Sequence, residues 1–517
     1  MHFAKVHSAQ INMLKAYIVD IEVDISKNTL NAFSIVGLPD KAIEESKDRV
    51  SAAIKNSGFK SPKEKNQKVV TSLAPSNFKK EGPHFDLGIA IAYLLASEEI
   101  NFDSTKKIFL GELTLDGQLR QIDGTLPLVR EAKRKGFQEI FLPLANAKEG
   151  ALIDGIKIFG VKTLIELVNH LKSENLKEPE GLIDKKLKAQ PQTKIDFSDS
   201  TPLIDFADVR GQEIAKRGLE IAASGCHNIA MYGPPGTGKT MLAKAFCNIL
   251  PSLTFEEILE TTSIHSVAGL LKGELVTHPP FRSPHHTASY ISLVGGGTIP
   301  QPGEVTMAHK GVLFLDEFPE FERRAIEALR QPLEDGIINI SRSKGTTTFP
   351  ADFILIATMN PCPCGNYGTD KECTCAPASL LRYQRKISGP IIDRIDMWVE
   401  VSNIKHEKLS QKNNHSEKTN AIQKRVSKAR EIQRERFKNS ITNTNSNMSA
   451  KDIENLITLD KQTQAVLNQS ASQLGLSARA YHKIIKLART IADLEQQEHI
   501  KQEHILEALQ YRPKTLL

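Results

Sequence analysis

The chain has 517 residues, too many for one hydrophobic core, and its composition is ordinary for a globular protein. The formal net charge of +6 is small for this length, so overall charge neither requires nor excludes a nucleic-acid partner. The first residues contain no apolar signal core, and the longest apolar run, 87–96, is too short to cross a bilayer. These features predict a cytoplasmic protein without a membrane partner. Six cysteines in such a chain argue against a disulfide framework and leave metal binding or free thiols.

The first 171 residues alternate strand-like and helix-like runs, which predicts a separate α/β or α+β domain. Strands are expected at 16–23 and 106–110, and helices at 41–55, 86–96 and 127–135. Residues 172–203 are polar and charged and contain few apolar side chains. We interpret them as a linker between this domain and the next.

A phosphate-binding loop follows the apolar run 228–232 and precedes a helix-like run at 241–246. Its residues fit the pattern G-x-x-x-x-G-K-[ST]: Gly233, Pro234, Pro235, Gly236, Thr237, Gly238, Lys239 and Thr240. Glycines allow backbone N–H groups to turn toward phosphate oxygens, the lysine neutralises the β- and γ-phosphates, and the threonine hydroxyl can ligate Mg²⁺. The loop predicts a nucleoside triphosphatase that uses Mg²⁺.

Two further apolar runs end in polar residues that suit the same site. The run 311–315 leads into Asp316, the expected Mg²⁺ partner, and Glu317, the expected base that orients water. The run 353–358 leads to Asn360, whose amide could sense the γ-phosphate or hold the attacking water. Alone, an Asp-Glu pair is usually a solvated strand end and an Asn-Pro a turn. In this order behind a phosphate loop, the residues favour a catalytic site where three strand ends converge.

Four cysteines follow Asn360 in two close pairs, Cys362 with Cys364 and Cys373 with Cys375. Four thiolates can surround a tetrahedral Zn²⁺, so we expect structural zinc. The single residue within each pair is fewer than in common zinc knuckles, and a reduced, metal-free loop is the alternative. The pair His285 and His286 has no third ligand at suitable spacing and is not assigned to a metal.

The segment 403–517 begins with a basic stretch and ends in helical periodicity. Between residues 405 and 438 there are eleven Lys or Arg against four Glu, which fits either phosphate contacts or a solvated helix. Apolar residues then recur on one face at Ile484, Leu487, Ala488, Ile491 and Leu494, and a further helix carries Ile505, Leu506 and Leu509. This pattern predicts a small helical lid after a nucleotide-binding core at 204–402.

Together these motifs resemble the AAA+ superfamily and, within it, the magnesium-chelatase-like ComM/YifB family. Three stretches carry the resemblance in addition to the phosphate loop: 281–289 (FRSPHHTAS), 361–365 (PCPCG) and 388–396 (SGPIIDRID). The resemblance covers nearly the whole chain. It implies a P-loop αβα core and a C-terminal helical lid like that of magnesium chelatase.

The resemblance also assigns roles to two arginines. Arg394, in the segment Asp-Arg-Ile-Asp, matches the arginine finger that reaches the nucleotide of a neighbouring subunit, and such a finger works only in an oligomer. Arg479 matches the sensor arginine of the lid, which would couple the lid to the nucleotide state. For each, the simpler alternative is a solvated surface arginine.

Two insertions resemble those of AAA+ motors that grip DNA. The run 289–303, which is rich in glycine, resembles a helix-2 insert, and 338–349 resembles the hairpin before sensor 1, with its turn at 343–345. Arg342 and Lys344 at the tip are candidate contacts for DNA phosphates. An ordinary solvated hairpin is the alternative.

The N-terminal domain resembles the proteolytic domain of Lon at 80–90 and at 111–136. Lon chemistry needs a serine just after the Gly-Pro and a later lysine. Here His84, Phe85 and Asp86 follow Gly82-Pro83, and Leu126 stands where the lysine is expected. We therefore expect an inactive peptidase fold that serves as a scaffold.

The motifs predict a nucleoside triphosphatase, and the resemblance implies a ring-forming AAA+ ATPase, a hexamer, that couples ATP hydrolysis to movement on single-stranded or branched DNA. The family resemblance implies a branch-migration helicase that promotes homologous recombination during natural transformation. One alternative is a chelatase-like or chaperone-like remodeller of a protein partner. Another is a DNA-binding ring whose nucleotide only controls assembly.

Overall fold

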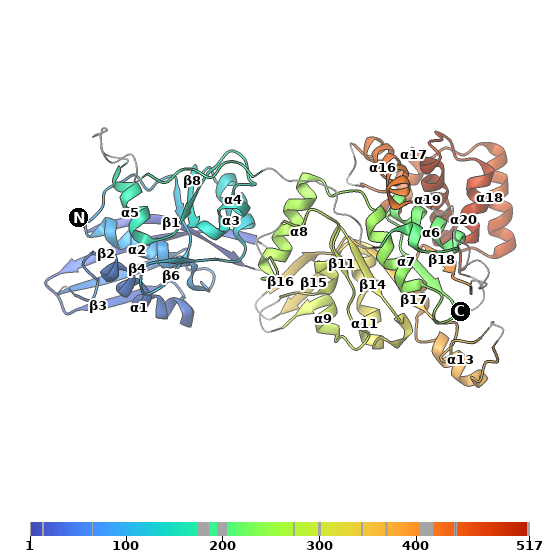
Figure 1. The fold of residues 1–517 in the computed structure, drawn as a ribbon, viewed down its shortest axis with the longest axis horizontal. Helices are drawn as coiled ribbons and strands as arrows, with labels where there is room; N and C mark the ends of the chain where they lie inside the picture. The colour runs from blue at the N-terminus through green and yellow to red at the C-terminus, as the bar shows by residue number, and fades with distance from the viewer. Residues whose placement is uncertain are drawn as a thin grey trace. The chain divides into compact units, whose positions relative to one another are not determined.

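The protein was analysed as a computed structural model, which describes residues 2–12, 15–64, 66–173, 186–193, 204–271, 275–297, 301–342, 345–367, 371–403, 417–438, 440 and 442–513. The chain forms two compact units (Figure 1). Unit 1 contains Met1–Asp196 and Ile258–Val276, and unit 2 contains Phe197–Glu257 and Thr277–Leu517. Among the described residues, no helix is both long and apolar enough to cross a membrane.

Unit 1 is built on a seven-stranded mixed sheet with the order β3-β4-β2-β1-β5-β8-β9. Its strands are β1 (Phe3–Asn12), β2 (Lys15–Lys27), β3 (Ala32–Val36), β4 (Gln67–Ala74), β5 (Lys107–Phe109), β8 (Glu139–Pro143) and β9 (Lys157–Val161). A small ribbon joins β6 (Glu112–Leu113) to β7 (Leu119–Arg120). Pairs β1–β2 and β2–β4 are antiparallel and the other pairs are parallel.

Two hydrophobic clusters pack helices against this sheet. One includes α1 (Lys41–Asn56), α2 (Asp86–Ala96) and α5 (Leu164–Ser173), and the other includes α3 (Thr125–Arg134) and α4 (Leu144–Gly150). The helices and strands predicted for this region are present, with ends shifted by at most a few residues. A sheet that carries apolar residues on both faces needs such a helix layer on each of them.

The segment 258–276 differs from the prediction, which placed it in the nucleotide-binding core. It contains most of α8 (Phe255–Val267) and packs in unit 1, where Leu259 joins the cluster of α3 and α4. The hydroxyl of Ser266 accepts the N–H of Gly124 at 2.8 Å and donates to Glu149 at 3.1 Å. These contacts hold the segment in unit 1, although the residues on either side of it in the chain belong to unit 2.

The predicted linker also differs where the structure describes it. Residues 186–193 lie along unit 1, because the N–H of Gln190 donates to Ile158 O at 2.7 Å and that of Thr193 to Ala151 O at 3.0 Å. Residues 174–185 and 194–203 lie outside the described residues.

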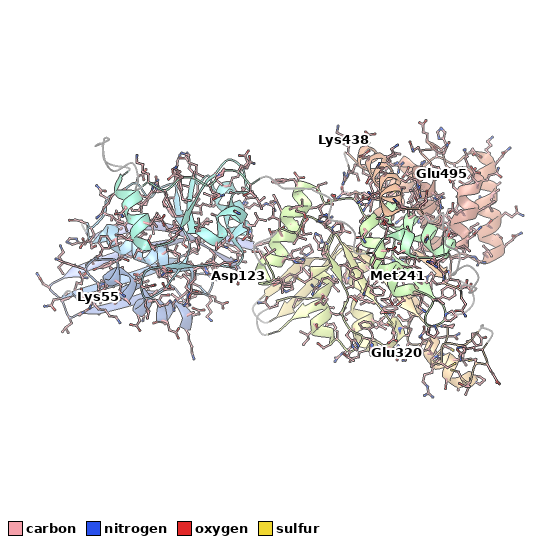
Figure 2. The ribbon with its side chains drawn as sticks, viewed as in Figure 1. Lys55, Asp123, Met241, Glu320, Lys438 and Glu495 are labelled. Carbon is pink, nitrogen blue, oxygen red and sulfur yellow. The ribbon has the colours of Figure 1, made fainter. Side chains whose placement is uncertain are left out.

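Unit 2 contains a five-stranded parallel sheet with the order β11-β14-β17-β10-β18. The strands are β11 (Phe281–Arg282), β14 (Val312–Leu315), β17 (Ile354–Met359), β10 (Ile229–Tyr232) and β18 (Met397–Glu400). Every residue of the three central strands, β14, β17 and β10, is buried, as expected for strands covered on both faces. Helices of the core are α6 (Glu213–Gly225), α7 (Lys239–Phe246), α9 (Tyr290–Val294), α10 (Glu304–Met307), α11 (Arg323–Ala328), α12 (Arg330–Asp335), α13 (Pro377–Gln384) and α14 (Gly389–Ile392). Figure 2 shows Met241 on α7, the helix after the phosphate loop.

The C-terminal helices share one hydrophobic core with the parallel sheet and so belong to the same unit. They are α16 (Thr419–Arg436), α17 (Ala450–Leu456), α18 (Lys461–Leu474), α19 (Ala478–Leu494) and α20 (Gln502–Gln510). The face predicted from residue 484 to residue 494 is buried. In α20, Ile505 and Leu509 are buried as predicted, whereas Leu506 is half exposed. Arg425 on α16 pairs with Glu220 of α6 at 2.6 Å, which uses one charge of the basic stretch inside the unit.

Candidate nucleotide site

The phosphate loop begins directly after β10. Gly236 and Gly238 have φ of +79° and +88°, a region that L side chains rarely adopt, and a Cβ at either position would have no atom within 4 Å. α7 begins at Lys239, so its free N–H groups end in the loop. The loop is therefore open and shaped to receive an anion.

Lys239 lies inside this loop. Its ammonium donates to Gly233 O at 2.6 Å, to Pro234 O at 2.7 Å and to Asn360 Oδ1 at 3.2 Å. Burial lowers the pKa of Lys239 to about 8, and the carboxylate of Asp316 opposes that shift. The contact with Asn360 joins the ends of β10 and β17, which are neighbours in the sheet.

Asp316 and Thr240 form the second part of the site. The Thr240 hydroxyl donates to Asp316 Oδ2 at 2.8 Å. The other oxygen of Asp316 accepts the Thr358 hydroxyl and the N–H of Glu317, the latter at 3.1 Å. Sequence reasoning missed Thr358, for which the only signal is a polar residue near the end of an apolar strand. The hydroxyl and carboxylate together offer the oxygen ligands that Mg²⁺ prefers.

Glu317 is exposed at the end of β14 and has φ of +53°. A left-handed conformation costs a non-glycine residue roughly 1–2 kcal/mol and is concentrated at functional sites. His286 Nδ1 lies 3.4 Å from Glu317 Oε2. Sequence reasoning did not find this contact, although His286 stands in the family stretch 281–289. The imidazole and the expected catalytic carboxylate are thus in position to interact.

Arg394, the expected arginine finger, and Arg479, the expected sensor arginine, lie elsewhere in unit 2. Arg394 donates to Arg330 O at 3.1 Å and to Pro390 O at 2.7 Å, and it forms an ion pair with Glu334. Arg479 Nη2 lies 3.5 Å from the same Glu334 carboxylate.

These arginines line a pocket of about 760 Å³ together with Asn228, Lys483 and Lys486. Asn228 precedes β10 and donates to Arg394 O at 3.2 Å, whereas Lys239 follows that strand. The arginines therefore lie at the amino edge of the parallel sheet, and the phosphate loop lies at its carboxyl edge. The expectation that Arg479 senses nucleotide through the lid did not anticipate that Arg479 and Arg394 would contact the same carboxylate, that of Glu334.

The hairpin predicted at 338–349 is present. Strands β15 (Ile337–Arg342) and β16 (Gly345–Pro350) pair antiparallel, and Arg342 lies opposite Gly345. Lys344 and the side chain of Arg342 lie outside the described residues. In the predicted insert, α9 is followed by a ribbon of β12 (Gly295–Gly296) and β13 (Gln301–Pro302).

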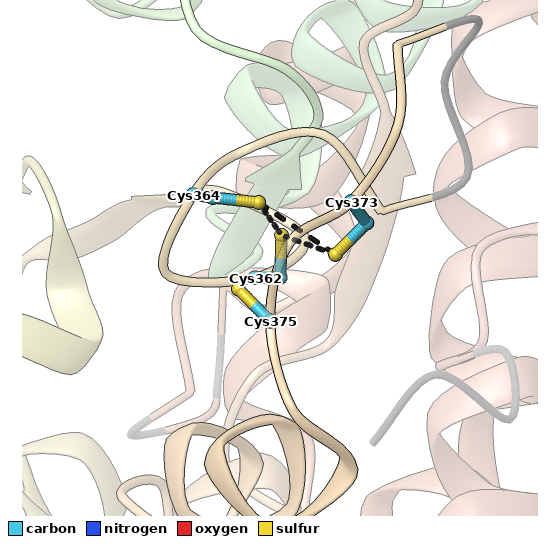
Figure 3. A group of neighbouring side chains, drawn as sticks. All are labelled: Cys362, Cys364, Cys373 and Cys375. Atoms are coloured by element: carbon cyan, nitrogen blue, oxygen red, sulfur yellow. Dashed lines mark hydrogen bonds between the residues drawn. The ribbon is translucent and has the colours of Figure 1, made fainter.

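The four cysteines that follow Asn360 lie together (Figure 3). Their sulfur atoms all lie within 4.8 Å of one another, and they are the one group made only of cysteines among the described residues that could hold a metal ion. We call residues 361–367 and 371–376 the two cysteine segments.

Comparison with known proteins identifies the family. The chain is 42% identical to the competence protein ComM of Haemophilus influenzae over 522 aligned positions, which cover 100% of this chain and 99% of that protein. The chain belongs to the ComM/YifB family. It is also 40% identical to YifB of Escherichia coli, over 99% of this chain and 97% of that protein. A 67 kDa magnesium-chelatase subunit of Chlorobaculum parvum is 28% identical over 163 residues, 31% of this chain and 24% of that subunit.

Family models match three parts of the chain. Residues 205–409 match the magnesium chelatase subunit ChlI, residues 416–512 match the ChlI C-terminal region, and residues 21–146 match a model described as subunit ChlI of Mg-chelatase. ComM/YifB proteins therefore carry magnesium-chelatase-like AAA+ domains followed by a helical region. Membership of this ATPase superfamily implies ATP and Mg²⁺ as ligands of the site.

Proposed function

We propose that this ComM/YifB protein hydrolyses ATP at the carboxyl edge of the unit 2 sheet. One observation carries the proposal: Asp316 and Asn360, which follow β14 and β17, meet the phosphate loop that follows the neighbouring strand β10. Lys239 of the loop donates to Asn360 at 3.2 Å, and the next residue, Thr240, donates to Asp316 at 2.8 Å. Ligands of open α/β sheets bind at this edge. The open phosphate loop fits a triphosphate.

In this proposal each residue has one role. The loop N–H groups and Lys239 bind the β- and γ-phosphates, and Thr240 and Asp316 would hold Mg²⁺, which neutralises charge on the phosphates. Glu317 orients the attacking water and Asn360 faces the γ-phosphate. Because Glu317 lies 3.4 Å from His286, the imidazole would restrain this carboxylate until the site is fully assembled.

Arg394 and Arg479 act on the nucleotide of a neighbouring subunit. Both pair with Glu334 and share a pocket with Asn228, which precedes β10, whereas the phosphate loop follows that strand; this arrangement supports action on the loop of a neighbouring subunit. A hexameric ring would bring this edge of one subunit to the loop of the next. Charge that grows on the phosphoryl oxygens is then neutralised by rigid guanidinium groups supplied from outside the loop.

The motor would act on DNA. The relative from H. influenzae is named a competence protein, which supports a role in natural transformation, and we propose branch migration of recombination intermediates. The β15–β16 hairpin is the proposed contact with DNA phosphates in the central pore, through the sequence candidates Arg342 and Lys344. A cytoplasmic location is part of this proposal.

Unit 1 would be a scaffold with the fold of the Lon peptidase domain but without its chemistry. Asp86, which follows the Gly-Pro, is buried against Arg49 at 2.8 Å, and Leu126 is fully buried. Burial also lowers the pKa of His84 to about 4, so this imidazole is neutral near pH 7. These residues support the unit's own packing.

In unit 2, the four cysteines would hold a structural Zn²⁺.

The test is the steady-state ATPase rate without DNA and with single-stranded, duplex or four-way-junction DNA. Lys239→Ala serves as the blank, and Glu317→Gln should bind ATP and stall. Stimulation that is greatest with junctions supports branch migration. Hydrolysis that ignores every DNA refutes it and favours a remodeller of a protein partner, and normal function of Glu317→Gln would favour a ring that uses nucleotide only to assemble.

A further inference from the structure

The geometry of the four thiols fits a tetrahedral metal. The Cys362 sulfur lies 3.3 Å from that of Cys364 and 3.8 Å from that of Cys373, and the latter two are 3.6 Å apart. With Zn–S bonds of about 2.3 Å, a regular tetrahedron has S···S edges of about 3.8 Å. A disulfide needs about 2.05 Å. The three separations are near that edge length, the Cys375 sulfur lies within 4.8 Å of the other three, and none of the three separations is that of a disulfide.

Backbone conformation resolves the close spacing within the first pair. Gly365 has φ of +82°, which turns the chain after Cys364, and the N–H of Tyr367 donates to the Cys362 sulfur at 3.3 Å. Such N–H groups orient thiolates and disperse their charge in the shell around a metal. The chain therefore turns directly after the first pair and brings a backbone N–H to the Cys362 sulfur.

Both cysteine segments lead back to Asn360. Cys362 follows it by two residues, and Cys375 stands just before α13. On α13 the buried Tyr383 donates its hydroxyl to the backbone O of Asn360 at 3.2 Å. Asn360, which contacts Lys239, is thus connected to both cysteine pairs. The chain leads from it directly to the first pair, and α13, which follows the second pair, contacts its carbonyl through Tyr383.

The first cysteine segment also packs against the phosphate loop. A Cβ at Gly365 would lie 2.7 Å from the Cδ of Pro235, so the backbone of Gly365 lies directly against the Pro235 ring. A metal held by the four cysteines would therefore connect the phosphate loop, Asn360 and α13, the helix whose Tyr383 contacts Asn360.

We propose that Zn²⁺ bound by the four cysteines closes the two segments on one another and so positions Asn360 and the phosphate loop for ATP hydrolysis. The inference rests on the proposed ATPase activity for its rate effect, but not for metal binding itself. The cysteines are positioning residues, because they act through Asn360 and do not touch the nucleotide. Coupling between two sites is reciprocal, so bound nucleotide must also retain the metal.

The first experiment measures metal in the full-length purified protein. One equivalent of zinc per chain is expected, and growth with Co²⁺ should give the thiolate-to-cobalt charge-transfer and tetrahedral d–d bands. Cys375→Ser should lose the metal, Cys375→His should keep it, and Cys247→Ala is the matched cysteine control outside the cluster. Absence of bound metal from the wild type, with no uptake of Co²⁺, overturns the proposal.

The second experiment separates positioning from stability. We expect Cys375→Ser to lower kcat about ten- to hundredfold, the scale of small misplacements in an active site, and, because the coupling is reciprocal, to weaken ATP binding as well. Cys375→His should restore much of kcat. Equal rates for the serine, histidine and wild-type proteins would refute the positioning role even if zinc is present.

The third experiment does not depend on hydrolysis. The rate of zinc transfer to a chromogenic chelator is measured with and without a non-hydrolysable ATP analogue. The analogue should slow transfer from the wild type and leave transfer from Lys239→Ala unchanged. If the protein never hydrolyses ATP but the analogue retains zinc, the ATPase proposal fails and the coupling stands. If zinc leaves at one rate in both conditions, the coupling is refuted.

Discussion

The low pKa of Lys239 predicts that ATP binding takes up a proton at alkaline pH. In the free protein, burial lowers the pKa of this ammonium to about 8. Phosphate oxygens in the loop would favour its charged form and raise the pKa again. The neutral amine therefore populates only the free protein, and binding converts it to the ammonium.

The magnitude follows from linkage between proton and nucleotide. With a pKa of about 8 in the free protein, the amine is about 75% neutral at pH 8.5, so binding should take up about 0.75 proton per site. If only the ammonium binds ATP, the Kd should rise about tenfold between pH 7 and pH 9. Below pH 7 the lysine is already charged and neither effect remains.

Isothermal titration calorimetry with MgATP, on the Glu317→Gln protein so that no hydrolysis occurs, measures both quantities. Titrations at pH 8.5 in two buffers of different ionisation enthalpy give the proton count. Lys239→Arg is the matched control, because a guanidinium stays charged throughout this range, and its Kd should be independent of pH. A wild-type Kd that is constant from pH 7 to 9, with no proton uptake, would show that burial does not depress this lysine.

Three further perturbations test other parts of the structure. Arg394→Ala and Lys239→Ala should each be inactive. An equal mixture of the two should regain about a quarter of the wild-type ATPase rate, because half of the subunits have an intact loop and half of their neighbours supply the arginine. No recovery would refute the shared site. His286→Ala should raise ATPase without DNA and reduce its stimulation by DNA, since Glu317 is no longer restrained, and an unchanged ratio of the two rates would count against that restraint. Asp493→Asn should cost about 3–5 kcal/mol in denaturant unfolding because it removes a buried carboxylate that pairs with two arginines, and a loss below about 1 kcal/mol would show that this network contributes little.

Local patterns in the sequence were sufficient to predict many helices and strands. They also grouped the polar residues that lie at the carboxyl edge of the unit 2 sheet. Buried parallel strands appear as continuous apolar runs, and the polar residues after them meet because parallel strands end at one edge. Asp316 and Asn360 could therefore be assigned together although 44 positions separate them. The alternating hairpin and the apolar face of α19 were predictable from the same kind of periodicity.

Contacts made by single side chains between distant segments were not predictable. Tyr383 reaches the carbonyl of Asn360, and His286 reaches Glu317, through geometry that no spacing rule encodes. The packing of 258–276 in unit 1 depends on Leu259 and Ser266, which look like ordinary helix residues in the chain. Periodicity identifies which face of an element is apolar, but it leaves open which other element covers that face.

The two edges of the unit 2 sheet explain why the proposed enzyme needs more than one subunit. The phosphate loop follows β10, and the Arg394–Glu334–Arg479 cluster lies where that strand begins. Under the proposed function, one chain would therefore offer a nucleotide site on one edge and its completing cations on the other. Two unlike surfaces that bind each other form a heterologous contact, which generates a ring if the rotation closes and a filament if it does not. Glu334 would have to release both arginines as that contact forms, so assembly and completion of the catalytic site become one event.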